Sequence, residues 1–179
     1  MKKILFVGAE AMPFAATGGL GDVLGSLPAA IKEAGGEDVD VRVVIPLYSA
    51  VSDAWRKKMK KIAEYELALA WRKQYCGIYS LIKDGVTYYF IDNEYYFKRD
   101  TLYGHYDDGE RYAFFCKAAV DMLGVVGFYP DILHAHDWQA ALCPIYLNRK
   151  YRGYEGYENI KTVFTIHNIE YQAQTRLRV

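Results

Sequence analysis

The sequence predicts an α/β fold with a mostly parallel sheet, helices on both faces and a β-hairpin excursion. Two strand, helix, strand patterns, one toward each end of the chain, predict parallel strands joined by right-handed crossovers. Between them, residues 62–92 are rich in β-forming residues and contain Asp84-Gly85, a strong two-residue hairpin signal. These three observations together indicate a parallel sheet with an antiparallel segment.

The first pattern begins with a short apolar run, Ile4 to Val7, whose β-branched members suit a strand buried on both faces. A glycine-rich turn follows, and apolar residues then recur at helical spacing as far as Gly35-Gly36, which can stop the helix. Val41 to Ile45 forms the second expected strand and ends at Pro46. The apolar helical positions are Leu20, Val23, Leu24, Leu27 and Ile31.

The middle of the chain holds a cationic stretch and a long loop. We interpret residues 55–61, WRKKMKK, as a solvated helix face and not as a nucleic-acid patch, because their neighbours are ordinary. Residues 93–109 are aromatic, charged and poorly periodic, which predicts a long loop of a kind that often carries function. The remaining expected elements are a helix over 110–123, a strand over 131–135, a helix over 138–147 and a strand over 161–166.

Length and composition favour one domain spanning residues 1–179. The 22 basic and 22 acidic residues cancel, so no overall field favours nucleic acid or an anionic membrane. No segment approaches the roughly 20 apolar residues of a membrane helix. The three cysteines include no C-x-x-C pair and suggest neither a disulfide framework nor a cysteine zinc site, so we expect a cytoplasmic protein.

Polar residues gather after three of the expected strands. In an open parallel sheet, ligands bind beyond the carboxyl ends of the strands. Three of the four histidines lie at such ends, and the fourth, His105, lies in the loop over 93–109. This convergence predicts a binding or catalytic site. The residues concerned are Glu10, His134, His136, Asp137, Trp138, His167 and Asn168.

Simpler roles stay open for several of these residues. Asp137 also suits the N-cap of the helix that begins near Trp138. Trp138 and Tyr171 fit either the core or an apolar platform for a sugar ring. The Asp107-Asp108 pair fits a loop solvated by its charges.

The glycine loop, AATGGLGDVLGSLP over 15–28, is not a known phosphate loop. A dinucleotide fingerprint needs glycine at position 24, which is Leu, and a Walker loop needs Gly-Lys-Ser/Thr, which is absent. A Gly18-Gly19 turn that feeds a helix N-terminus remains. Such a turn favours an anion weakly and is explained equally well by a tight strand-to-helix connection.

Four ordered stretches resemble the bacterial glycogen synthases, which are ADP-glucose-using glycosyltransferases (family 5) similar to plant starch synthases. This resemblance implies the GT-B architecture, in which two Rossmann-like domains face each other across a cleft. It identifies residues 1–179 as the N-terminal, acceptor-side domain, without the C-terminal nucleotide-binding domain, and implies that the isolated chain folds but is inactive. The stretches are MKKILFVGAEAMPFAATGGLGDVLGSLPAAI, NEYYFKRDTLYGHYDDGERYAFFCKA, PDILHAHDWQAALCPIYL and TVFTIHNIEYQ.

The same resemblance implies a reaction and its residues. Glucose would pass from ADP-glucose to the non-reducing end of an α-1,4-glucan (glycogen) with retention, without a metal or other cofactor. The implied catalytic residues are His136, which would contact the transferred glucose near its reacting centre, and Asp137. Backbone N–H groups of the glycine loop would approach the diphosphate. The implied donor- or acceptor-binding residues are Thr17, Gly18, Gly19, Asp22, Tyr103, Asp107, Asn168 and Tyr171.

Two positions depart from the family pattern. Ala16 replaces a loop lysine, which removes a charge expected beside the donor phosphates, and Ala173 replaces a glycine. Two other functions stay open. One is a metal-dependent hydrolase, because His134 and His136 lie on the same face of a strand. The other is a non-catalytic glycan-binding module, which the aromatic residues permit.

Overall fold

The computed structural model describes residues 1–170 and contains one seven-stranded sheet in the order β3-β4-β5-β2-β1-β6-β7. Tyr171 and Ala173 lie outside the described residues, so the expectations for these two positions stay predictions. In chain order the elements are β1 (Lys2–Val7), α1 (Gly19–Gly35), η1 (Gly36–Asp38), β2 (Val39–Pro46), α2 (Asp53–Arg56), β3 (Lys60–Leu69), β4 (Arg72–Lys83), β5 (Val86–Asp92), α3 (Glu94–Phe97), α4 (Asp108–Val126), β6 (Ile132–His136), α5 (Asp137–Ala140), α6 (Leu142–Tyr146), η2 (Leu147–Tyr151) and β7 (Lys161–Thr165).

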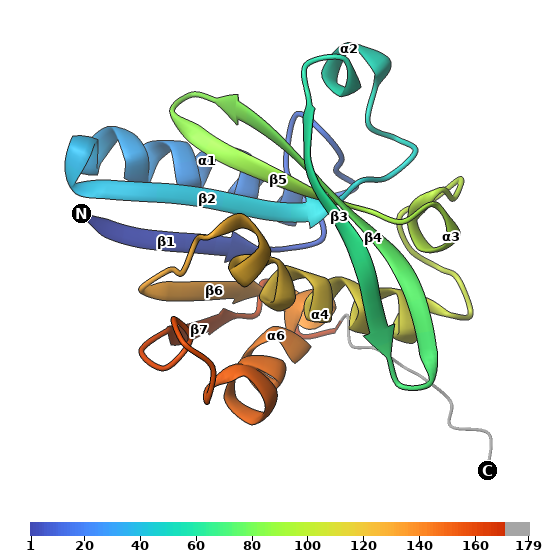
Figure 1. The fold of residues 1–179 in the computed structure, drawn as a ribbon. Coiled ribbons are helices and arrows are strands. Elements are labelled where there is room, and N and C mark those ends of the chain that lie inside the picture. The colour runs from blue at the N-terminus through green and yellow to red at the C-terminus, as the bar shows by residue number, and fades with distance from the viewer. Residues whose placement is uncertain (171–179) are drawn as a thin grey trace.

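Five strands of the sheet are parallel, with β1 at the centre. β1 pairs with β2 on one side and with β6 on the other, and β5 and β7 extend the two sides. Figure 1 shows α1 behind these strands and α4 in front of them, so helices cover both faces as predicted. Because the chain leaves β1 toward β2 and later returns beside β1 as β6, the strand order reverses between β1 and β6. Such a reversal is a topological switch point.

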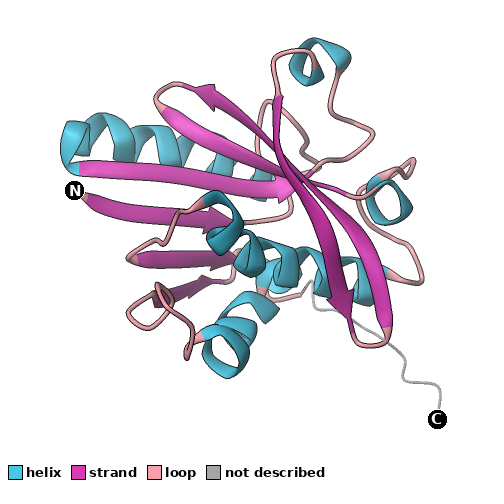
Figure 2. Ribbon diagram, in the orientation of Figure 1, coloured by secondary structure: helices cyan, strands magenta, loops and turns pink. Residues whose placement is uncertain are grey.

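The antiparallel excursion is confirmed and is larger than the hairpin signal indicates. β4 pairs antiparallel with β5 through Asp84 (φ 50°) and Gly85 (φ 73°), the left-handed pair that a two-residue hairpin turn requires. β3 pairs antiparallel with β4 through a second tight turn at Ala70 (φ 52°). Figure 2 shows the long β3–β4 hairpin crossing in front of α4, which contacts β3.

The interpretation of residues 55–61 as a helix face is wrong in its secondary structure. α2 ends at Arg56, and β3 begins at Lys60, which pairs with Ser80. The strand that pairs with β3 is β4, which lies outside residues 55–61, so the pattern within 55–61 gives no sign of this pairing. The lysines of this stretch are nevertheless exposed, as expected of a solvated face.

A buried arginine fixes the loop that precedes α4. The Arg111 side chain is fully buried and donates through Nε to the Tyr96 carbonyl (2.7 Å) and through Nη1 to the Leu102 carbonyl (3.0 Å) and Asp108 Oδ1 (2.5 Å). The Tyr112 hydroxyl donates to the same Leu102 carbonyl at 2.9 Å. The predicted loop is therefore held in one path, and Tyr103 follows directly after its anchor.

Candidate functional site

The polar groups predicted to converge do converge, at the switch point. Val7 at the end of β1 is level with Ala135 in β6, and His136 at the end of β6 is level with Thr165 in β7. The segments after these three strands therefore leave the sheet side by side. We call the group formed by Glu10, Thr17, Gly18, Tyr103, His136, Asp137, His167 and Asn168 the strand-end site.

Two histidine side chains of β6 are paired with the β7 end. His136 Nδ1 lies 2.8 Å from His167 Nε2, with the two rings stacked, and His134 Nε2 lies 2.7 Å from Thr165 Oγ1. His134 and His136 share one face of β6, as predicted, with ring centroids 4.0 Å apart. The sequence places His167 at a strand end but gives no sign of its bond to His136, because that bond depends on β7 lying beside β6.

Burial keeps His136 neutral. Its side chain has no exposed surface and stacks on Phe6, and its Nε2 has no hydrogen-bond partner among the described residues. Burial, together with the nearby His134 and His167, lowers the pKa of His136 to about 3. His167 is exposed. The imidazole that faces solvent at this end of the sheet is therefore that of His167.

Asp137 does not cap a helix. The N-cap position of α5 is His136, and no side chain caps that helix, so the N-cap alternative is wrong. Asp137 Oδ1 instead accepts the backbone N–H of His167 at 2.7 Å, and Asp137 itself adopts φ 57°. A left-handed backbone at a non-glycine residue stores strain and is found at functional sites. Asn168 is exposed, and its Oδ1 accepts the N–H of Glu170 at 3.0 Å.

Glu10 precedes the glycine loop in sequence and contacts its first residues. Its carboxylate accepts the backbone N–H groups of Thr17 (2.5 Å) and Gly18 (3.3 Å) and the hydroxyls of Thr17 (2.9 Å) and Tyr103 (2.5 Å). The sequence predicts Glu10 at the strand end but does not predict its contacts. Its signal is an acidic residue directly after a buried strand and before a glycine loop.

The two central glycines of the loop border open space. A Cβ added at Gly18 or Gly19 would meet no atom within 4 Å, and Gly18 has an extended backbone (φ −168°). Neither packing nor a left-handed backbone therefore requires glycine at position 18. Asp22 is exposed in the first turn of α1. Ala16 is also exposed. It packs closely against Gly21, since a Cβ added at Gly21 would lie 2.3 Å from the Cβ of Ala16.

Aromatic rings continue the site toward α4 and α5. The Tyr103 ring lies 5.9 Å from that of Tyr112, which meets Trp138 edge-on at 5.1 Å. Burial, the Tyr112 hydroxyl and the Glu10 carboxylate raise the pKa of Tyr103 far above its ordinary value. Trp138 is half-buried and packs against the core, so it serves the core and leaves part of its ring at the surface.

The Asp107-Asp108 pair is structural, so its interpretation as a solvated loop is wrong. Asp107 Oδ2 accepts from Arg99 at 2.9 Å, and Asp107 Oδ1 is buried without a partner among the described residues. Asp108 Oδ2 accepts the N–H of Gly104 at 2.9 Å, and its other oxygen accepts from Arg111. Both carboxylates hold the loop that presents Tyr103.

The described residues bear on two further expectations. Within residues 1–170, no group of three or more His, Cys, Asp or Glu side chains is arranged to hold a metal ion, so His134 and His136 have no third ligand there. No helix in this part of the chain is long and apolar enough to cross a membrane. A hollow lies apart from the histidines, at the ends of β2 and β5, lined by Leu47, Ser49, Asp53, Arg56, Asp92, Glu94 and Lys98.

Comparison with known proteins gives a consistent picture. The chain is 52% identical over 170 residues to a glycogen synthase of Anoxybacillus flavithermus and 51% identical to that of Bacillus subtilis. These alignments cover 95% of this chain and 34% of each relative, so the chain spans about a third of their length. The catalytic domain of starch synthase IV from Arabidopsis thaliana, solved bound to ADP and acarbose, superposes with a TM-score of 0.83 at 29% identity. That superposition covers 96% of this chain and 34% of the Arabidopsis chain.

The family assignment rests on nearly the whole length of the chain. The family model for the starch synthase catalytic domain matches residues 3–178. The relatives and the sheet order agree with it. The chain therefore belongs to the starch synthase catalytic domain family of glycosyltransferases.

Proposed function

We propose that this chain is the acceptor-side part of a glucosyltransferase that moves glucose from ADP-glucose to the non-reducing end of an α-1,4-glucan with retention of anomeric configuration. The observation that carries the proposal is the meeting of the glycine loop, the His136–His167 pair and Asp137 at the switch point of a sheet of this family. The Arabidopsis relative, solved with ADP and acarbose, supports ADP as the leaving group.

The sugar-facing group of the histidine pair is His167. The resemblance implies that His136 contacts the transferred glucose, but the His136 side chain is fully buried and its Nδ1 is bonded to His167. We assign His167 to the sugar hydroxyls, with His136 behind it as a neutral partner that fixes the ring. Asp137 holds the backbone of His167 and, with Asn168, forms the polar wall of the pocket.

The donor lies along the glycine loop. The open space beside Gly18 and Gly19 admits a ligand close to the backbone, and Asp22 presents a carboxylate to sugar hydroxyls at the first turn of α1. Thr17 lies on the same loop, and Tyr103, Asp107 and Tyr171 form the acceptor side. The departing diphosphate gathers negative charge, so its electrostatic stabilisation is a major part of catalysis.

The chain alone binds but does not turn over. We assign residues 1–179 to a single N-terminal domain, and a facing domain supplies the nucleotide grip and the cations for the diphosphate. The relatives are about three times as long as the matched segment, which leaves room for such a domain. We place the protein in the cytoplasm, which suits its three free, buried cysteines.

Fluorescence and turnover together test this proposal. Maltoheptaose added to the chain should change the emission of Trp138, which is half-buried beside the acceptor side, and ADP-glucose alone should give no glucan synthesis. A Trp138→Phe variant identifies the reporter. Synthesis should appear when the C-terminal part of a relative is supplied. Glucan binding without turnover in that mixture would favour a non-catalytic binding module, and robust synthesis by the chain alone would contradict the division between domains.

A further inference from the structure

A buried carboxylate lies between the glycine loop and Tyr103. Glu10 is 3% exposed and is the only fully buried Asp or Glu among residues 1–170. None of the ion pairs in this part of the chain includes Glu10. A buried charge without a counter-ion is costly unless hydrogen bonds replace its lost water. Local donors must therefore hold the Glu10 carboxylate in place.

All four hydrogen bonds of Glu10 run toward its carboxylate. Oε2 accepts the backbone N–H groups of Thr17 and Gly18, and Oε1 accepts the hydroxyls of Thr17 and Tyr103. An ionised carboxylate offers two acceptor sites on each oxygen, which matches this arrangement of two donors on each side. Charge-assisted bonds of this kind are about twice as strong as neutral ones.

These bonds join two loops that are remote in sequence and fixed at their bases. Thr17 and Gly18 precede α1, whereas Tyr103 follows the anchor that Arg111 makes to Leu102. Glu10 follows β1. Between β1 and Glu10, the Gly8 N–H donates to the Val44 carbonyl of β2 at 3.2 Å, which fixes this segment to the sheet. Gly21 leaves room for the carboxylate, since a Cβ there would lie 3.3 Å from Oε2.

We propose that Glu10 is a positioning residue whose carboxylate fixes the glycine loop against Tyr103. The spacing between the donor loop and the acceptor side is then set by one side chain of the sheet end. The positioning itself rests on the observed contacts, and its effect on glucan affinity rests on the proposed function. Glu10 has no free acceptor site for substrate while all four bonds are made.

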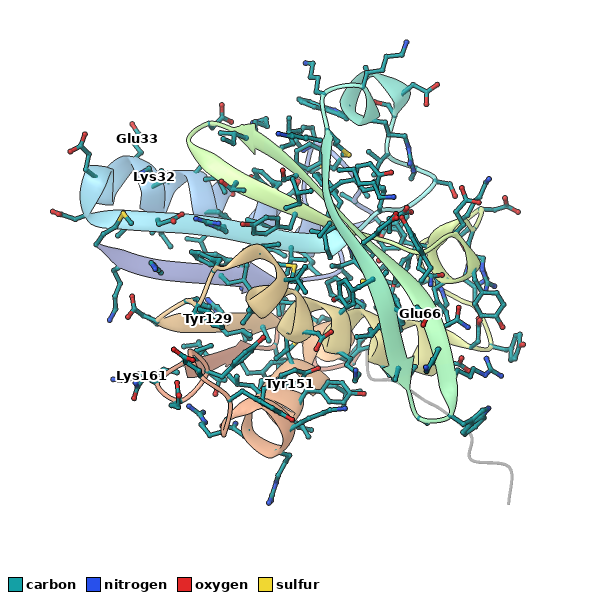
Figure 3. All side chains as sticks on the ribbon, in the orientation of Figure 1. Lys32, Glu33, Glu66, Tyr129, Tyr151 and Lys161 are labelled. Carbon is teal, nitrogen blue, oxygen red and sulfur yellow. The ribbon has the colours of Figure 1, made fainter. Side chains whose placement is uncertain are left out.

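Two substitutions separate the carboxylate's contacts. Glu10→Met removes all acceptors while keeping the side-chain length. Glu10→Gln keeps one carbonyl oxygen, which must face the backbone N–H groups, because the hydroxyls of Thr17 and Tyr103 can turn to accept from the amide and the backbone groups cannot. The matched control is Glu33→Gln, the same chemical change on α1, which Figure 3 shows at the opposite end of the sheet from the strand-end site.

Amide hydrogen exchange and a double-mutant cycle test the positioning without any enzymatic activity. Exchange at the N–H groups of Thr17 and Gly18 should accelerate about tenfold or more in Glu10→Met, less in Glu10→Gln, and not in Glu33→Gln. Tyr103→Phe should shift the unfolding equilibrium in the wild-type background and have little effect when Glu10 is Met. If the Met variant fails to fold, the cycle with Glu10→Gln decides: its amide still bonds the Tyr103 hydroxyl but without charge, so Tyr103→Phe should have a smaller effect there than in the wild-type background.

Maltoheptaose affinity then connects the positioning to the site. Its Kd should rise about tenfold in Glu10→Met and in Tyr103→Phe, without a further rise in the double variant. Unchanged exchange at Thr17 and Gly18, or equal effects of Tyr103→Phe in both backgrounds, would overturn the positioning role. A wild-type chain that does not bind maltoheptaose would instead overturn the proposed acceptor role, and the exchange and unfolding results would still decide the role of Glu10.

Discussion

Asp137 offers a direct measure of how much strain the strand-end site carries. Its backbone is left-handed, and its carboxylate accepts the His167 N–H at 2.7 Å. Three substitutions separate these two properties. Asp137→Asn keeps an acceptor and a side chain that tolerates the left-handed region, Asp137→Gly removes the acceptor and the strain, and Asp137→Ala removes the acceptor and increases the strain.

The expected magnitudes follow from the geometry. The hydrogen bond involves a charged acceptor but lies near the surface, so we take the lower end of the usual range, about 1.5 kcal/mol. The left-handed backbone costs an alanine about 1–2 kcal/mol relative to glycine. The stability order should therefore be wild type, Asn, Gly and Ala, with Ala at least about 1 kcal/mol below Gly.

Urea unfolding followed by tryptophan fluorescence measures this order. The m-values should stay equal, so that shifts in midpoint report stability alone. Equal stability of Asp137→Ala and Asp137→Gly would show that the backbone at this position is not strained. A glycine variant more stable than wild type would show that the bond to His167 contributes less than the strain it accompanies.

Three further predictions concern other parts of the site. Folding lowers the pKa of His136 from an ordinary value near 6.5 to about 3, so on acidification the unfolded state binds the proton first. The free energy of unfolding should therefore be full above pH 6.5 and decline toward pH 3, by at most about 1.4 kcal/mol per pH unit from this group. His136→Gln should flatten the decline between about pH 6.5 and 5 in urea titrations, and an unchanged slope would contradict the lowered pKa. Ala16→Lys should strengthen ADP binding, measured by calorimetry, by about threefold to tenfold at low salt and by less at high salt. Ala16→Gln is the uncharged control, and equal ADP affinities of the two variants would contradict an electrostatic role at this position. Arg111→Met removes the donor to the Tyr96 carbonyl and the cation beside Asp108, and it leaves the Leu102 carbonyl with the Tyr112 hydroxyl alone. It should cost about 3 kcal/mol or more in thermal unfolding, with faster amide exchange around Tyr103. A loss below about 1 kcal/mol would show that the loop has another anchor.

Local signals account for the parts of the fold that were predicted from sequence. Asp84-Gly85 marks its hairpin because both residues must adopt positive φ, and few residue pairs do so easily. The second hairpin turns at Ala70-Trp71, which carries no glycine, so no local signal marks it. The helix expected over 55–61 fails for a related reason, since pairing with β4 outweighs the local pattern from Lys60 onward.

The same distinction applies to the strand-end site. Its location was predictable, because the carboxyl ends of parallel strands share one edge of the sheet. Its internal bonds were not. The bond between His136 and His167 requires β7 to lie beside β6, and the bond between Glu10 and Tyr103 crosses 93 residues along a path fixed by Arg111. Such pairings depend on tertiary geometry that no spacing in the sequence reveals.

The charges of the strand-end site bear on how the proposed transfer would be stabilised. Its ionisable members other than Tyr103 are Glu10, Asp137 and two histidines, of which His136 is neutral, and Asp22 adds another carboxylate in the first turn of α1. None of these residues is a Lys or Arg, and position 16 is Ala. The Thr17 and Gly18 N–H groups, the natural partners for a phosphate, are bonded to Glu10. A leaving diphosphate that gains negative charge here would meet mainly carboxylates, so the stabilising cations must come from outside this set of residues. The proposed transfer therefore depends on Lys or Arg side chains that lie outside the strand-end site, whereas binding of a neutral glucan does not.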